Sequence, residues 1–159
     1  MRKQKGFSLI ELLIVVAIIL IIAAIAIPNL IKSKMAANQS GAASTVRTIN
    51  SGEVTYTAVC SQVGYSAALT DLYNTGTCVA GNGIVDAVVG SATGVKSGYT
   101  YAEVGAPGAN GTIDTYTTTA VPLTIGSTGQ NMFCSDESSV IRFDPSGGGC
   151  VATSLPIGE

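Results

Sequence analysis

The sequence predicts an α+β fold, in which one long N-terminal helix packs on a C-terminal antiparallel sheet of about four strands. Three patterns indicate this fold. An uncharged run covers residues 12–31, an apolar stripe at helical spacing follows it, and the hydrophobic period changes to two after Gly98. A chain of 159 residues has room for one small domain besides the helix.

The N-terminus combines a short basic leader, residues 1–6, with a long apolar segment, residues 7–31. Its uncharged part, residues 12–31, has the roughly 20 residues that a helix needs to cross the hydrocarbon core of a bilayer. We therefore predict a transmembrane helix in residues 7–31. Basic residues ahead of the span favour a cytoplasmic N-terminus.

Glu11 lies inside this apolar segment, where an ionised group is costly, by about 2.5–3.5 kcal/mol at the centre of a bilayer. Ser8, its nearest polar neighbour, is too short and neutral to compensate the charge. Cleavage between Gly6 and Phe7 would create an α-amino group on Phe7, which is positively charged at neutral pH. Phe7 and Glu11 share a helix face, so this amine could pair with Glu11 of its own chain or of a neighbouring chain.

Residues 5–18 (KGFSLIELLIVVAI), with Pro28 downstream, resemble the N-terminus of type IV pilins and of the pseudopilins of type II secretion. The close similarity covers residues 1 to about 50. In that family a prepilin peptidase cuts after the glycine and N-methylates the new phenylalanine. The resemblance thus implies processing at Gly6 and Phe7, and an assembly role for Glu11 and Pro28. Many family members also carry a glycine within the apolar helix, where this chain has Leu20.

The resemblance implies a pilin-like structural subunit that forms a helical homopolymer, is not an enzyme and needs no cofactor. Its expected partners are other copies of itself, the prepilin peptidase and an inner-membrane assembly platform. Before assembly it would span the inner membrane once, and afterwards it would belong to a filament on the cell surface or in the periplasm. A major-type pseudopilin of a type II secretion system is the alternative within the family.

Two other interpretations of the N-terminus were considered. An ordinary signal peptide would use residues 24–26 (AIA) as its cleavage site and release a secreted β-rich binding domain that begins near Ile27. A signal anchor without processing would keep Met1. The signal-peptide interpretation leaves Glu11 unexplained.

Beyond the span, the predicted regions are an amphipathic helix (residues 32–59), a connecting region (60–97), and a sheet closed by a C-terminal disulfide loop (98–159). We expect Pro28 to bend or loosen the helix. The helical stripe consists of Met35, Ala42, Val46, Ile49, Tyr56 and Cys60, and the charged or polar residues that lie mostly off it are Lys32, Lys34, Asn38, Arg47 and Glu53. Residues 66–73 could form a short helix with Ser66 as its N-cap.

The sheet is predicted from alternation and turn residues. Tyr99, Tyr101 and Glu103 alternate with smaller or β-branched neighbours, and a turn is expected at residues 105–111 (GAPGANG). The further strands are expected at residues 112–121, 130–134 and 139–143.

The four cysteines lie on the expected outer side of the membrane, where disulfides form. Three connectivities are possible. We favour the one in which each pair closes a short local loop, Cys60–Cys78 with Cys134–Cys150. Zinc is disfavoured because the chain has no histidine and no Cys-x-x-Cys spacing.

Composition limits the remaining function classes. Three of the eight basic residues lie in the leader, so the processed chain would carry five basic and ten acidic residues, and we predict no nucleic-acid partner for the isolated subunit. Without histidine, a serine or cysteine nucleophile lacks its commonest base, so we predict no catalytic residue. Asp136, Glu137 and Asp144 could in principle bind calcium, but their spacing matches no ligand loop, and we predict no metal site.

Overall fold

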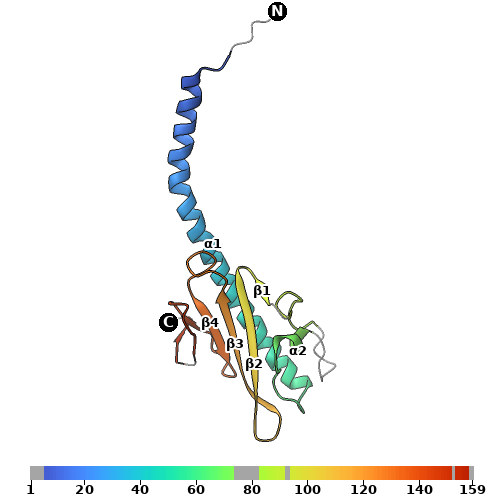
Figure 1. The fold of residues 1–159 in the computed structure, drawn as a ribbon. Coiled ribbons are helices and arrows are strands. Elements are labelled where there is room, and N and C mark those ends of the chain that lie inside the picture. Colours follow the sequence, from blue (N-terminus) through green and yellow to red (C-terminus); the bar gives the residue numbers. More distant parts are fainter. Residues whose placement is uncertain (1–5, 74–82, 92–93, 152, 158–159) are drawn as a thin grey trace, which may run out of the picture. The chain divides into compact units, whose positions relative to one another are not determined.

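A computed structural model describes residues 6–73, 83–91, 94–151 and 153–157. The chain divides into two compact units, Met1–Lys34 and Met35–Glu159, which are treated separately below. Two helices occur in the described residues, α1 (Leu9–Val59) and α2 (Leu69–Tyr73), and α1 is 51 residues long. The expected long helix is confirmed (Figure 1).

Within the first unit, α1 passes through Pro28 without a break in its helical assignment. Proline has no N–H, so the carbonyl one turn earlier loses its usual donor. The side-chain amide nitrogen of the next residue, Asn29, donates at 3.1 Å to a different carbonyl, that of Ile25. The helix loses one backbone hydrogen bond at Pro28 and does not end there.

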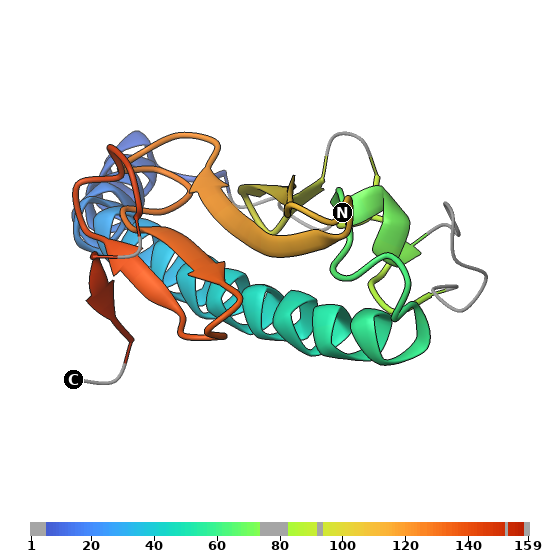
Figure 2. The ribbon, with the colours of Figure 1, turned by 90° about the horizontal axis from the view of Figure 1, so that it is seen from below.

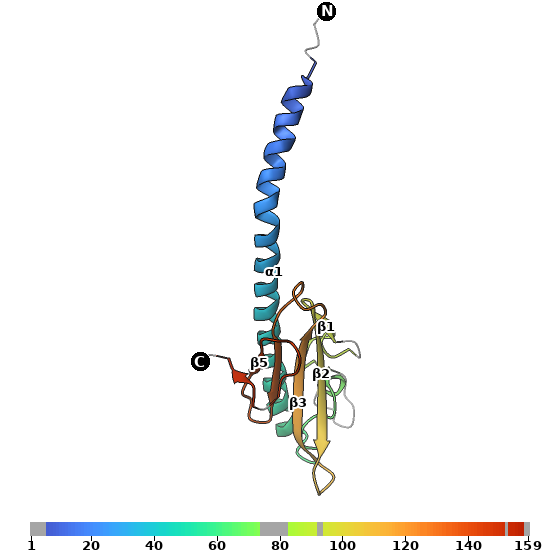
Figure 3. The same ribbon diagram turned by 60° about the vertical axis from the view of Figure 1, so that its left-hand side comes forward.

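The second unit contains an antiparallel sheet in the order β1-β2-β3-β4-β5-β6, so each strand pairs with its neighbour in the sequence (Figure 3). The fold class is confirmed, with six strands in place of about four. The strands are β1 (Val95–Lys96), β2 (Tyr99–Pro107), β3 (Ile113–Pro122), β4 (Met132–Asp136), β5 (Arg142–Asp144) and β6 (Leu155–Pro156).

Residues 35–59 of α1, called its outer part, belong to the second unit. They lie along one face of this sheet, which Figure 2 shows from below. The predicted stripe supplies the helix side of the core: Ala42, Val46 and Ile49 are fully buried, whereas Met35 is only half-buried. The sheet contributes Tyr99, Tyr101, Ala120 and Phe133 to the core. Tyr56, near the end of α1, and Cys60, directly after α1, are buried in the same core.

One prediction about the helix face is wrong. Glu53 was expected mostly off the stripe, but it is fully buried against the sheet. Gly52 beside it is also buried, and a Cβ at this position would come within 2.7 Å of the Ile84 side chain. Here glycine permits the close approach of residues 84–85 to the helix.

Two local predictions also need correction. The short helix after α1 begins at Leu69, and Ser66 is not its N-cap, because the Ser66 hydroxyl contacts buried carboxyl groups instead. Strand β2 continues to Pro107, so it includes the first three residues of the expected turn. The turn is closed by Gly108, whose N–H donates to the Thr112 carbonyl at 2.7 Å.

Candidate assembly site

The start of α1 has the Glu11 half of a capping box, in which the side chain of the third helical residue accepts the N–H of the residue before the helix. Ser8 immediately precedes the first helical residue, Leu9, and Glu11 is the third residue of the helix. The backbone N–H of Ser8 donates to Oε2 of Glu11 at 2.9 Å. Sequence reasoning considered only the side chain of Ser8 and so missed this partner. This hydrogen bond satisfies the Ser8 N–H, and it keeps the Glu11 carboxylate at the N-terminal, positive end of the helix dipole.

Gly6 and Phe7 lie just outside the helix, and both are exposed. A Cβ at Gly6 would meet no atom within 4 Å, and the backbone there is not in the left-handed region. The described structure thus gives no packing or backbone reason for glycine at this position. Phe7 is 83% exposed, so its ring makes no buried contact.

The apolar part of α1 is exposed along its length. One helix among the described residues is long and apolar enough to cross a membrane, with a mean hydropathy of 3.3 over an 18-residue window, and none of that window is buried. Large side chains such as Leu9, Ile10 and Leu20 are each more than half exposed. A surface of this kind marks contact with a membrane or with other protein.

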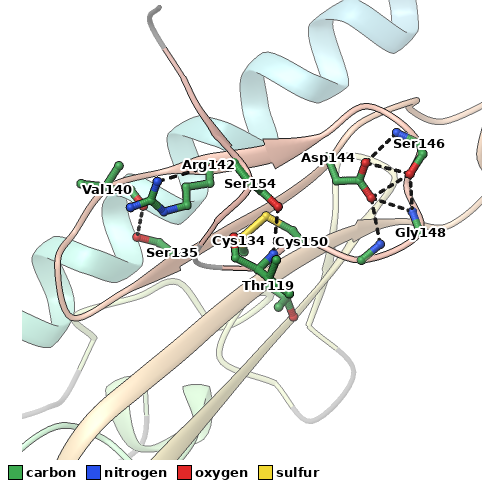
Figure 4. The surroundings of a disulfide bond; sticks show 12 residues. Thr119, Cys134, Ser135, Val140, Arg142, Asp144, Ser146, Gly148, Cys150 and Ser154 are labelled. Atoms are coloured by element: carbon green, nitrogen blue, oxygen red, sulfur yellow. Dashed lines mark hydrogen bonds between the residues drawn. A yellow bond between two sulfur atoms is a disulfide. The ribbon is translucent and has the colours of Figure 1, made fainter.

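The C-terminal segment is held by a disulfide between Cys134 of β4 and Cys150, which confirms one of the two favoured pairs (Figure 4). The Cα atoms are 5.6 Å apart, within the usual range for a disulfide. Cys60 is also disulfide-bonded, whereas Cys78 lies outside the described residues.

Asp144 organises the loop between β5 and Cys150. Its carboxylate accepts hydrogen bonds from the N–H groups of Ser146, Gly148 and Gly149 at 2.9–3.0 Å, and from the Ser146 hydroxyl (Figure 4). The Ser146 bonds are the main reason why the pKa of Asp144 is lowered. Within the described ranges, no three Asp, Glu, Cys or His residues gather as a metal would require. The loop therefore uses Asp144 as an internal hydrogen-bond acceptor.

Residues 1–27 match the family model described as "Prokaryotic N-terminal methylation motif". The start of the chain is thus similar to that motif. Within it, Gly6 and Phe7 precede the helix and Glu11 closes the capping box. The resemblance to type IV pilins that the sequence suggested is confirmed for this segment.

Two curated proteins are similar to part of the chain. The "Type IV wide pilus major component PilA4" of Thermus thermophilus is 60% identical over 40 residues, which are 25% of this chain and 30% of the relative. The "Type IV major pilin protein PilA" of Myxococcus xanthus is 46% identical over 54 residues, 34% of this chain and 24% of the relative. The chain thus matches less than a third of either relative's length. No solved structure matches.

Sequence reasoning missed the buried polar residues of the outer helix. Asn50 is buried, its amide nitrogen donates to the Ser135 hydroxyl at 2.8 Å, and its oxygen accepts from the Tyr116 hydroxyl at 3.2 Å. Asn50 and Glu53 are three residues apart, which places both on one helix face. Their spacing beside the apolar stripe is the sequence signal that could have indicated their burial.

Proposed function

We propose that this chain is the structural subunit of a type IV pilus-like filament. The precursor spans the inner membrane once, with its N-terminus in the cytoplasm. A prepilin peptidase cuts it after Gly6 and N-methylates Phe7. An inner-membrane assembly platform then adds the mature subunit to a helical homopolymer. Similarity to two pilins and to the methylation motif supports the pilus assignment.

The observation that carries the proposal is the exposed apolar helix that follows the methylation motif. A water-soluble protein would not leave such a surface uncovered. The membrane covers it in the precursor, and neighbouring copies of the same helix cover it in the filament. One segment, residues 7–31, therefore serves as membrane anchor first and as filament core later.

Glu11 supplies the register between neighbouring helices. Its Oε2 is occupied by the Ser8 N–H of its own chain. Carboxylate oxygens accept more than one hydrogen bond, so Oε1 is available to a second donor. In the filament, that donor is the Phe7 amine of an adjacent subunit. The capping box fixes the direction of the carboxylate, and the ion pair in a low-dielectric core fixes the axial position of the neighbour.

Pro28 and Gly6 have supporting roles in the proposal. Pro28 removes one hydrogen bond from α1, which makes the helix easier to unwind there when subunits pack together. Gly6 serves recognition by the peptidase, since the described fold gives no other reason for a glycine at that position.

The major-type pseudopilin of a type II secretion system remains the second candidate, because the methylation motif is expected in both classes. Both curated relatives are named as pilins, which favours the pilus. Loss of the gene separates the two. A pilin mutant loses surface filaments and secretes normally, whereas a pseudopilin mutant fails to export the substrates of the secretion system.

The test is electron microscopy of surface filaments sheared from cells that carry or lack the gene. We expect filaments that disappear on deletion and return when the gene is restored, with this chain as a protein component. Unchanged filaments in the deletion strain, together with a soluble form of the chain in the medium, would support a secreted binding domain instead.

A further inference from the structure

Four polar side chains meet in the interior of the second unit, away from the methylation motif. Glu53 comes from α1, Ser66 from the segment after α1, Glu103 from β2 and Thr118 from β3. Glu53, Ser66 and Thr118 are fully buried, and Glu103 is 6% exposed. Two carboxyl groups in one buried cluster need an explanation, because burying a charge costs free energy unless it is paired.

The contacts link all four residues. Glu53 accepts the Ser66 backbone N–H at 2.9 Å through Oε2, and its Oε1 lies 2.6 Å from the Ser66 hydroxyl. The same hydroxyl also contacts Oε1 of Glu103. The other oxygen of Glu103, Oε2, accepts from the Thr118 hydroxyl at 3.0 Å. Ser66 therefore bridges the two carboxyl groups.

Counting hydrogens shows how the bridge can form. A serine hydroxyl has one hydrogen to donate, yet Ser66 Oγ contacts two carboxyl oxygens. If both carboxyl groups were ionised, one of these contacts would bring two acceptors together without a hydrogen between them. One carboxyl must therefore be protonated and donate to Ser66 Oγ. Each acid also accepts one other hydrogen bond, so these contacts require one shared proton, and the burial of Glu103 beside the charge of Glu53 assigns that proton to Glu103.

We propose that Glu53, Ser66 and Glu103 form a proton-dependent latch that fastens the outer part of α1 to the sheet. In the latched state, Glu103 donates to Ser66 Oγ, the Ser66 hydroxyl donates to Glu53, and Glu53 is ionised. Loss of the Glu103 proton places two negative charges on either side of one hydroxyl. The latch is then weakened, and α1 is held less firmly against β2 and β3.

The surroundings of the pair favour the protonated form. Burial, followed by the charge of Glu53, raises the pKa of Glu103 to about 8. Among the described residues, the other titratable groups around the pair are phenols and one acid: Tyr56 of α1, Tyr101 of β2, Tyr116 of β3, Tyr65, and Asp71 of α2, which acts on Tyr56. Burial raises the pKa of both Tyr56 and Tyr116, so these phenols stay neutral through the range where Glu103 titrates.

Protons from solvent can reach the pair through a surface pocket of about 180 Å³. Glu103 lines this pocket. The other lining residues are Ala68, Leu69, Thr70, Ser91, Tyr101 and Ala102. The latch is therefore able to respond to the pH outside the domain.

The test measures how the unfolding equilibrium constant of the outer domain depends on pH. The full chain in detergent micelles is unfolded with urea and followed by near-UV circular dichroism, since the chain has no tryptophan and all six tyrosines lie at or after Tyr56. The folded Glu103 keeps a proton that the unfolded chain releases above its ordinary pKa of 4.5. Stability therefore falls as pH rises from about 4.5 to about 8, and one linked proton gives roughly a tenfold rise in the unfolding constant per pH unit.

We expect about a 100-fold rise in the unfolding constant between pH 5.5 and 7.5 for the unaltered chain. In Glu103→Gln, the amide mimics the protonated carboxyl, donating to Ser66 Oγ and accepting from Thr118, so this rise should disappear. The exposed Glu137→Gln is the matched control and should keep it. If Glu103→Gln does not fold, Glu53→Gln serves instead. Removing the Glu53 charge should lower the pKa of Glu103 in the folded chain, so the rise in the unfolding constant should end at a lower pH.

Two results would overturn the latch. One is an unfolding constant of the unaltered chain that changes less than threefold between pH 5.5 and 7.5. The other is a tenfold rise per pH unit that persists in Glu103→Gln. Neither result affects the proposed filament function, because the latch lies outside the methylation motif.

Discussion

Replacing Glu11 by glutamine separates the two tasks that this carboxylate has in the proposal. In the single chain, Glu11 Oε2 accepts the Ser8 N–H at 2.9 Å. The amide oxygen of Glu11→Gln can accept the same hydrogen bond, since glutamine also serves in capping boxes. Glu11→Ala loses this bond as well as the charge. Comparing the two variants therefore isolates the contribution of the charge.

The two contributions differ in size. A capping interaction contributes about 1 kcal/mol, or roughly a fivefold change in an equilibrium constant. Removing one partner of a buried ion pair costs about 3–5 kcal/mol, because the other charge is left unpaired. This cost corresponds to a loss of assembly of roughly 10²- to 4 × 10³-fold. Glu11→Gln should therefore assemble almost as poorly as Glu11→Ala.

The assay measures subunit in the membrane fraction and in sheared filaments of cells that express each variant. We expect both variants to insert into the membrane and to be cleaved, and we expect sheared filaments to be absent. The exposed Glu137→Gln should assemble normally and controls for expression. Normal filament yield from Glu11→Gln would refute the ion pair and leave the capping box as the only role of Glu11.

Three further predictions follow from the described contacts. Gly6→Ala should leave the fold unchanged, because a Cβ there meets nothing, yet the leader should remain on the chain in an intact-mass measurement. Replacing both Cys134 and Cys150 by alanine should lower the free energy of unfolding by about 3 kcal/mol, since their disulfide spans a sequence separation of 16 residues; urea titration measures the loss. Asn50→Ala leaves the buried Tyr116 hydroxyl without its acceptor and should cost about 1–3 kcal/mol in the same titration.

Local periodicity explains why most of the fold could be predicted. Ala42, Val46 and Ile49 follow the helical period, and all three are buried. Tyr99 and Tyr101 follow the strand period, and both point into the core. These patterns arise from the geometry of a single element, so they are visible without any knowledge of its partners.

The pairing of the two buried carboxyl groups could not be predicted, because it depends on segments that are distant in the sequence. Glu53 and Glu103 are brought together only when α1 packs on β2, and the charge of each residue alone suggests exposure. Ser66 gave the signal of a helix cap, yet its hydroxyl bridges the two acids. The tertiary arrangement here prevails over the local preference of each residue.

The edge strands were missed for a different reason. Strands β1 and β6 have two residues each, too few for any period to be visible. Each is defined by backbone pairing to its neighbour, such as Lys96 with Tyr99 and Phe143 with Leu155. Backbone pairing of this kind leaves little trace in the identity of the side chains.

The most direct test of the proposed function is the intact mass of the chain isolated from sheared filaments. The account predicts residues 7–159 with one added methyl group on the Phe7 amine and without the four cysteine hydrogens. A chain that retains Met1, or one that begins near Ile27, would contradict it. In either case the Phe7 amine that pairs with Glu11 of a neighbour would not exist.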